Sequence, residues 1–171
     1  LEDEAPSIEA AGKIDPENWR RIELVLLATD RSLVEVELLR PQWWIEAKGV
    51  EPGSSMHFVI EEMAIEGLAY VKGIDKSPAL ADGPGRMVTA TFERTSSTVI
   101  DLHLVGVKDP IGVTAGHLVF AVSRAGFVRV DELEPGDVLA TVSGVRVVER
   151  VSATRRIARV FNFSVDGRPW Y

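Results

Sequence analysis

Residues 112–122 read Gly-Val-Thr-Ala-Gly-His-Leu-Val-Phe-Ala-Val, and they decide how this chain of 171 residues is interpreted. They place the hydroxyl of Thr114 three residues before the imidazole of His117, directly ahead of an apolar run that predicts a strand. A histidine can protonate a leaving group near neutral pH, and a threonine hydroxyl can hold an amide by hydrogen bonds. The pattern makes these two residues candidate catalytic groups acting on a peptide bond. The spacing alone also fits a turn-capping threonine and a strand-end histidine without chemistry.

Three further segments follow this motif along the chain. They are Phe127-Val128-Arg129-Val130, then residues 131–139 (Asp-Glu-Leu-Glu-Pro-Gly-Asp-Val-Leu), then residues 159–167 (Arg-Val-Phe-Asn-Phe-Ser-Val-Asp-Gly). In this order the motifs resemble those of the Hedgehog/intein (HINT) domains, in particular the HINT modules of bacterial polymorphic toxins. The resemblance is specific over residues 86–171. It is looser over 15–85, where residues 43–47 and 83–92 look like elements of one toxin-associated subfamily.

The resemblance implies an all-β, HINT-like horseshoe of extended strands and a self-cleaving activity. In such domains a Cys or Ser attacks the carbonyl of the preceding residue, and the amide becomes an ester or thioester. Carried over by motif, His117 would protonate the scissile nitrogen and Thr114 would orient the amide. The implied setting is a self-processing module of a larger secreted or cell-surface bacterial toxin-like protein. Its partners would be the flanking domains of its own chain, and no cofactor is implied.

The chain departs from the family pattern at several positions. It has no cysteine and does not open on serine, and Leu118 stands where the family has proline. The late family histidine falls at Pro169, and residues 1–171 do not include the His-Asn pair that the family has after its last strand. We therefore expect the chain as it stands not to cleave itself, with the nucleophile supplied by sequence outside it. The alternative is a non-enzymatic, degenerate HINT scaffold that links or presents neighbouring domains.

Alternating and β-branched segments predict an all-β domain over residues 22–171, preceded by an acidic, proline-containing arm over 1–21. The strands are predicted at 22–27, 33–38, 56–60, 68–74, 87–92, 98–105, 118–122, 127–130, 138–142, 145–151 and 157–165. The pair 87–92 and 98–105 is expected to form a hairpin that turns at residues 94–97. One short helix is predicted over residues 40–49, with Pro41 at its first position, Lys48 in its last turn and Gly49 as its C-terminal cap.

Composition limits the class of protein and its partners. The apolar fraction of 46% and the charged fraction of 26% are typical of a globular domain. No apolar run approaches the ~18 residues that a membrane-spanning helix needs. The net charge of −7 argues against nucleic acid and anionic membranes as partners. The one basic run, residues 150–159, is interpreted as the solvated part of a hairpin.

A metal site made of His57, His103 and His117 is conceivable, because catalytic zinc can use three imidazoles. None of the three shows the short ligand spacing of a known metal motif. We therefore favour polar strand faces for the first two and predict no metal. Without cysteine, zinc–thiolate sites and disulfides are excluded.

Other polar and aromatic residues are expected to have structural roles. Asp137 is predicted to form an Asx-type turn that bonds backbone amides, and Asn162 a strand-end bond to the backbone. The carboxylates at residues 61–62 and 131–134 are predicted to be solvated loop charges. Trp43 and Trp44 are adjacent, so on a helix they point about 100° apart. Core packing is favoured for this pair over a binding role.

Overall fold

The structure is a computed structural model that describes residues 14–29, 31–60, 65–80, 83, 85–154 and 156–166. Strands dominate it, and the predicted all-β class is confirmed. The chain divides into two compact units: unit 1 is Leu1–Arg94 with Phe161–Tyr171, and unit 2 is Thr95–Val160. Each unit has its own buried cluster of apolar side chains. No helix within the described ranges is long and apolar enough to span a membrane.

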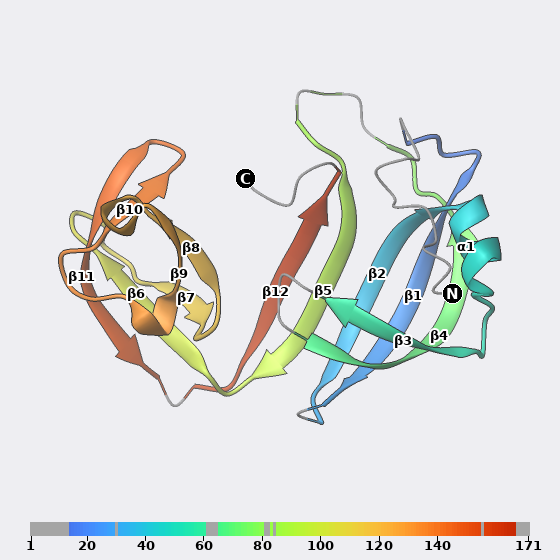
Figure 1. The fold of residues 1–171 in the computed structure, drawn as a ribbon, viewed down its shortest axis with the longest axis horizontal. Helices are drawn as coiled ribbons and strands as arrows, with labels where there is room; N and C mark the ends of the chain where they lie inside the picture. The colour runs from blue at the N-terminus through green and yellow to red at the C-terminus, as the bar shows by residue number, and fades with distance from the viewer. Residues whose placement is uncertain are drawn as a thin grey trace. The chain divides into compact units, whose positions relative to one another are not determined.

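Unit 1 is built on a six-stranded sheet in the order β12-β5-β2-β1-β4-β3 (Figure 1). The strands are β1 Trp19–Ala28, β2 Leu33–Pro41, β3 Ser55–Ile60, β4 Ile65–Lys76, β5 Val88–Ser96 and β12 Ala158–Val165. Every second residue is buried over 22–28 of β1 and over 34–38 of β2, including Ile22, Leu24 and Leu26 of β1. This period of two places one set of side chains on the core face and the other on the outer face.

The predicted helix is present as α1 Gln42–Lys48. Pro41 lies one position earlier than predicted, as the residue before the first turn. Gly49 adopts the left-handed conformation, with φ of 61°, and its N–H donates to the carbonyl of Glu46 at 3.1 Å. Trp44 is buried in the unit 1 core, Trp43 packs partly against it, and the predicted core packing of the pair is confirmed.

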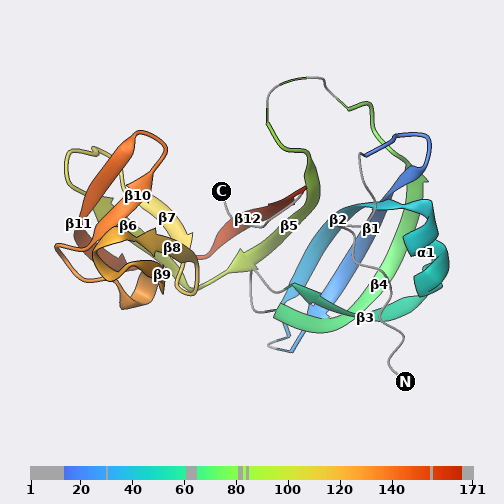
Figure 2. The ribbon, with the colours of Figure 1, turned by 45° about the horizontal axis from the view of Figure 1, so that its top comes forward.

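The unit 1 sheet is strongly curved (Figure 2). Within it, β4 approaches β1 closely at Gly67, where a Cβ atom would lie 2.0 Å from the carbonyl oxygen of Leu27. The first strand also begins at Trp19 rather than at residue 22, because Trp19 is buried in a small cluster with Ile14 and Leu39. Residues 1–13 of the predicted arm lie outside the described residues.

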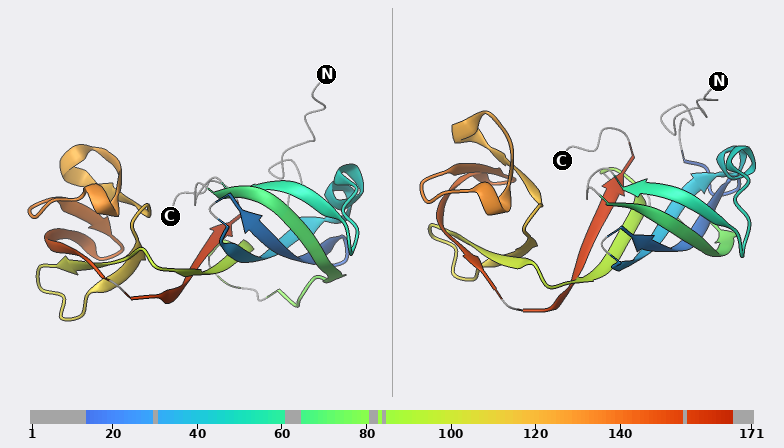
Figure 3. Two further views of the ribbon diagram at one scale, coloured as in Figure 1. Left: turned by 90° about the horizontal axis from the view of Figure 1, so that it is seen from below. Right: turned by 60° about the horizontal axis from the view of Figure 1, so that its bottom comes forward.

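Unit 2 contains a second six-stranded sheet in the order β7-β6-β11-β10-β8-β9 (Figure 3). The strands are β6 Val99–Leu104, β7 Ile111–Thr114, β8 Leu118–Ala121, β9 Gly126–Arg129, β10 Val138–Thr141 and β11 Gly144–Ala153. Short 3₁₀ turns, η3 Val122–Arg124 and η4 Val130–Glu132, follow β8 and β9. The core comprises Ile100, Leu102, Leu104, Ala121, Val130, Leu133, Leu139 and Val148.

The predicted hairpin between residues 87–92 and 98–105 is wrong. β5 pairs with β2, whereas β6 pairs with β7 and β11, so the two strands lie in different sheets. Polar residues between two strands signal a change of direction but do not choose the strand partners, which depend on distant segments. β7 was not predicted, because it is only four residues long and contains Gly112.

Candidate functional site at the turn from Thr114 to His117

Thr114 and His117 occupy the two ends of one tight turn. Thr114 is the last residue of β7 and lies opposite Val99 of β6. The N–H of His117 donates to the carbonyl of Thr114 at 3.0 Å, and β8 begins at the next residue. This is the hydrogen bond that closes a four-residue β-turn, in which the end Cα atoms lie within about 7 Å. The structure therefore brings the two predicted residues together, while their catalytic role stays a prediction.

The turn is fixed to its surroundings by three further backbone hydrogen bonds. Ala115 donates its N–H to the carbonyl of Thr98 at 3.1 Å and accepts from the N–H of Asp131 at 3.1 Å. The carbonyl of His117 accepts from the N–H of Val130 at 2.9 Å. The bonds from Asp131 and Val130 join the chain just after β7 to the chain just after β9, the two edge strands of the unit 2 sheet. The backbone of a site on this turn is therefore fixed in position. Catalysis requires such fixed positions for the groups that orient a substrate.

The side chains of Thr114 and His117 differ in exposure but share a lack of bonding partners among the described residues. Thr114 is half-buried and His117 is exposed. Within the described part of the chain neither side chain makes a hydrogen bond or an ion pair. Although His117 reaches solvent, surrounding protein atoms displace enough water to lower the pKa of its imidazole by desolvation. This shift favours the neutral ring, in which one nitrogen can accept a proton and the other can donate one.

Arg129 lies against this turn at Gly116. A Cβ atom at Gly116 would be 3.3 Å from Nη1 of Arg129, so glycine lets the guanidinium approach the backbone. Nε and Nη2 of Arg129 donate to the two carboxylate oxygens of Asp131 at 2.9 and 2.7 Å. This bidentate hydrogen bonding from Arg129 is the main reason why the pKa of Asp131 is lowered. The charge of Arg129 is therefore already balanced beside the turn, an arrangement that the sequence analysis missed.

Asp137, directly before β10, connects the η3 turn to the backbone at Glu134 by hydrogen bonds. Its carboxylate accepts from Nε and Nη2 of Arg124 at 2.9 and 2.7 Å and from the hydroxyl of Ser123 at 3.0 Å. It also accepts from the N–H of Glu134 at 2.9 Å. These contacts lower the pKa of Asp137. The hydrogen bonds from Arg124 have the largest effect, and the hydrogen bond from the Glu134 amide has the second largest. The bonded amide lies three residues before Asp137 instead of after it, but the predicted structural role matches these contacts.

The other predicted polar residues lie apart from the turn. His57 is on β3 of unit 1, and His103, on β6, has its Nε2 3.1 Å from Nη2 of Arg150. No group of three or more His, Cys, Asp or Glu side chains that could hold a metal occurs among the described residues. Asn162 accepts the N–H of Phe163 through Oδ1 at 2.9 Å, which fits its expected backbone bond. Residues 61–62, 169 and 171 lie outside the described residues.

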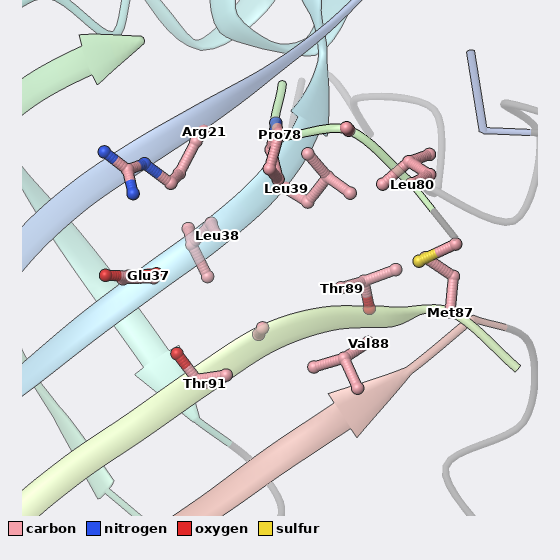
Figure 4. A pocket seen from close by; sticks show the side chains of 12 residues that line it. Arg21, Glu37, Leu38, Leu39, Pro78, Leu80, Met87, Val88, Thr89 and Thr91 are labelled. Carbon is pink, nitrogen blue, oxygen red and sulfur yellow. The ribbon is translucent and has the colours of Figure 1, made fainter. Parts of the chain in front are cut away.

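A cavity of about 240 Å³ lies in unit 1, at the end of β1, β2 and β5 (Figure 4). Leu39, Leu80 and Met87 gather at one end of it, while Arg21 and Glu37 lie at the other. Arg21 is already bound to Glu23 at 3.0 Å and to Asp75 at 3.2 Å. This cavity contains neither Thr114 nor His117, and it brings no second set of catalytic groups together.

Solved structures that are similar to this chain include two inteins or intein-like domains. The chain is 21% identical to the intein-like domain from Clostridium thermocellum, covering 87% of each chain, with a TM-score of 0.43. It is 13% identical to the TvoVMA intein, covering 88% of this chain and 89% of that one, also with a TM-score of 0.43. No family model and no curated protein matches the sequence. Likeness at this level does not establish a family.

Proposed function

We propose that this chain is a HINT-type autoprocessing module of a larger bacterial toxin-like protein, which cleaves the peptide bond that joins it to a passenger. The supporting observation is the turn from Thr114 to His117. It combines the motif of the proposed family with a backbone held on both sides and two side chains free to contact a substrate. The conclusion rests on that observation together with the order of the motifs downstream.

The proposed reaction is an acyl shift at the junction. The neutral imidazole of His117 takes the proton of a Cys or Ser at the junction, and the sulfur or oxygen attacks the preceding carbonyl. Thr114 donates its hydroxyl to the reacting amide and holds it in place. The C–N bond breaks as His117 returns the proton to the nitrogen, leaving a thioester or ester and a free amine. One proton and one acyl group are moved, so the step is balanced without a cofactor.

A second candidate function is a non-enzymatic scaffold that links neighbouring domains. The observation that favours it is compositional, because none of the 171 residues is cysteine. For autoprocessing, a serine or a residue outside this sequence would have to serve as the nucleophile.

The test is cleavage of the full-length protein that carries this sequence, followed by gel electrophoresis and intact mass, with and without a small thiol that intercepts the acyl intermediate. His117→Ala is expected to slow cleavage at least about 100-fold, because it removes the proton relay. Thr114→Val is expected to slow it about 100-fold, with partial recovery in Thr114→Ser. His57→Ala, on an exposed position of β3, is the matched control. A parent that stays intact under thiol supports the scaffold instead.

A further inference from the structure

The outer face of the unit 1 sheet carries a contiguous apolar surface, which we call the Leu27 strip. It consists of Val25, Leu27, Leu33, Leu68 and Tyr70. In the strand register Leu27 lies directly opposite Leu33 of β2 on one side and Leu68 of β4 on the other. Two residues along, Val25 lies opposite Tyr70. Neighbouring strands are about 4.8 Å apart, so these side chains touch or nearly touch across three strands.

Four of the five members of this strip are exposed to solvent, and Val25 is half-buried. Leu33 is 60% exposed, Leu68 57%, Tyr70 51% and Leu27 50%. Single exposed leucines are ordinary on protein surfaces, but adjoining ones in register mark a surface that another molecule covers. The sequence agrees, because β1 contains the unbroken apolar run 24–28. Such a run is typical of a strand that is covered on both faces, whereas a strand with one solvated face alternates.

Carboxylates border the Leu27 strip. Glu35 lies opposite Val25 in β2, and Glu66 lies two residues before Leu68 in β4. Both are exposed, and within the described residues neither forms an ion pair. Glu37 extends the acidic border along β2 beside Arg21, while the exposed cations Arg31 and Lys72 lie in the turn before β2 and further along β4. The border is therefore mainly negative, and it fits a partner that brings positive charge.

From this pattern we propose that the Leu27 strip is a docking surface for a basic amphipathic segment of a protein partner, with leucine-like side chains on the strip and Lys or Arg against Glu35 and Glu66. A second copy of this chain fits less well, because two identical faces would bring their carboxylates together. An anionic membrane fits less well for the same electrostatic reason. This surface does not involve Thr114 or His117, so the inference is independent of the proposed function.

The test measures binding of a fluorescent leucine/lysine peptide, patterned as an amphipathic helix, to the complete 171-residue chain by anisotropy. Saturable binding is expected, and Leu27→Ser combined with Leu68→Ser should weaken it at least about tenfold by removing two buried side chains from the contact. Val142→Ser combined with Val145→Ser is the control, because these valines are apolar and, at 110% and 53%, about as exposed as the leucines or more so, but they lie in unit 2. Circular dichroism melts establish that both double variants remain folded.

The contribution of the carboxylates is measured in the same experiment. Glu35→Gln combined with Glu66→Gln is expected to weaken binding about threefold at low salt, and a leucine/glutamate peptide should not bind. Equal binding by wild type and the Leu27/Leu68 variant, or no binding at all, overturns the proposal. So does wild-type dimerisation in light scattering that the same variant abolishes, or binding to anionic vesicles in preference to the peptide.

Discussion

His117 combines two properties at the scale of a single residue: an exposed ring and a pKa lowered by desolvation. In the proposed reaction the neutral ring must first accept a proton from the nucleophile. A lowered pKa keeps the ring neutral to a lower pH than an ordinary histidine, so the cleavage rate should rise with pH through a midpoint below about 6.5 and then level off. A relay that instead began with protonated His117 would lose rate as pH rises through this range.

The pKa of His117 can be measured without any cleavage, by following the ring proton signals in an NMR titration of the chain. The midpoint is expected below that of the same residue in the urea-unfolded chain. Because the unfolded state then binds more protons between the two midpoints, His117 should stabilise the fold above about pH 6.5, and that contribution should be lost as pH falls toward the folded pKa. A folded midpoint at or above the unfolded one would contradict desolvation as the dominant cause.

The strand β4 offers a matched pair of glycines for a test at the scale of one element. A Cβ atom at Gly67 would lie 2.0 Å from the backbone oxygen of Leu27, whereas one at Gly73 would meet nothing within 4 Å. Gly67→Ala must therefore push β4 away from β1 and is expected to lower the free energy of unfolding by about 2 kcal/mol or more. Gly73→Ala should change it by less than about 1 kcal/mol. Urea denaturation measures both, and equal effects would show that β1 yields easily at this point.

Elements whose signals are local were predictable from sequence. α1 is framed by Pro41 and Gly49, and β1 and β2 alternate around a short turn, so their positions follow from neighbouring residues. The partner of β5 was not predictable in this way. Residues 94–97 look like a hairpin turn, yet β5 pairs with β2, more than fifty residues earlier in sequence.

The candidate site shows the same division between local and distant signals. The spacing of Thr114 and His117 was visible, and the turn that joins them is local. Arg129, however, reaches Gly116 only because β8 and β9 pair, with Arg129 opposite Leu118. The Arg124–Asp137 ion pair likewise joins residues thirteen positions apart. Neither contact has a spacing that a single sequence makes recognisable.

At the scale of the whole molecule, the candidate catalytic site and the proposed docking surface lie in different units. The turn from Thr114 to His117 and its supports, Arg129 and Asp131, belong to unit 2. The Leu27 strip, the cavity at Arg21 and the only α-helix of the described residues belong to unit 1. Each unit buries its own apolar cluster, which contains Leu26 in unit 1 and Leu102 in unit 2. A domain with its own core can open separately from its neighbour.

Separate cores predict separate responses to a cavity-forming substitution. Leu26→Ala is expected to destabilise unit 1 by about 2–5 kcal/mol and to raise hydrogen exchange at the amides of β1, β2 and β4. The amides of β6, β10 and β11 should keep their protection, since their core does not include Leu26. Leu102→Ala is the reciprocal variant, expected to raise exchange in β6 and β11 and to spare β1 and β4. Exchange followed by mass spectrometry distinguishes this from a single cooperative unit, in which either substitution would raise exchange in both sheets to the same extent.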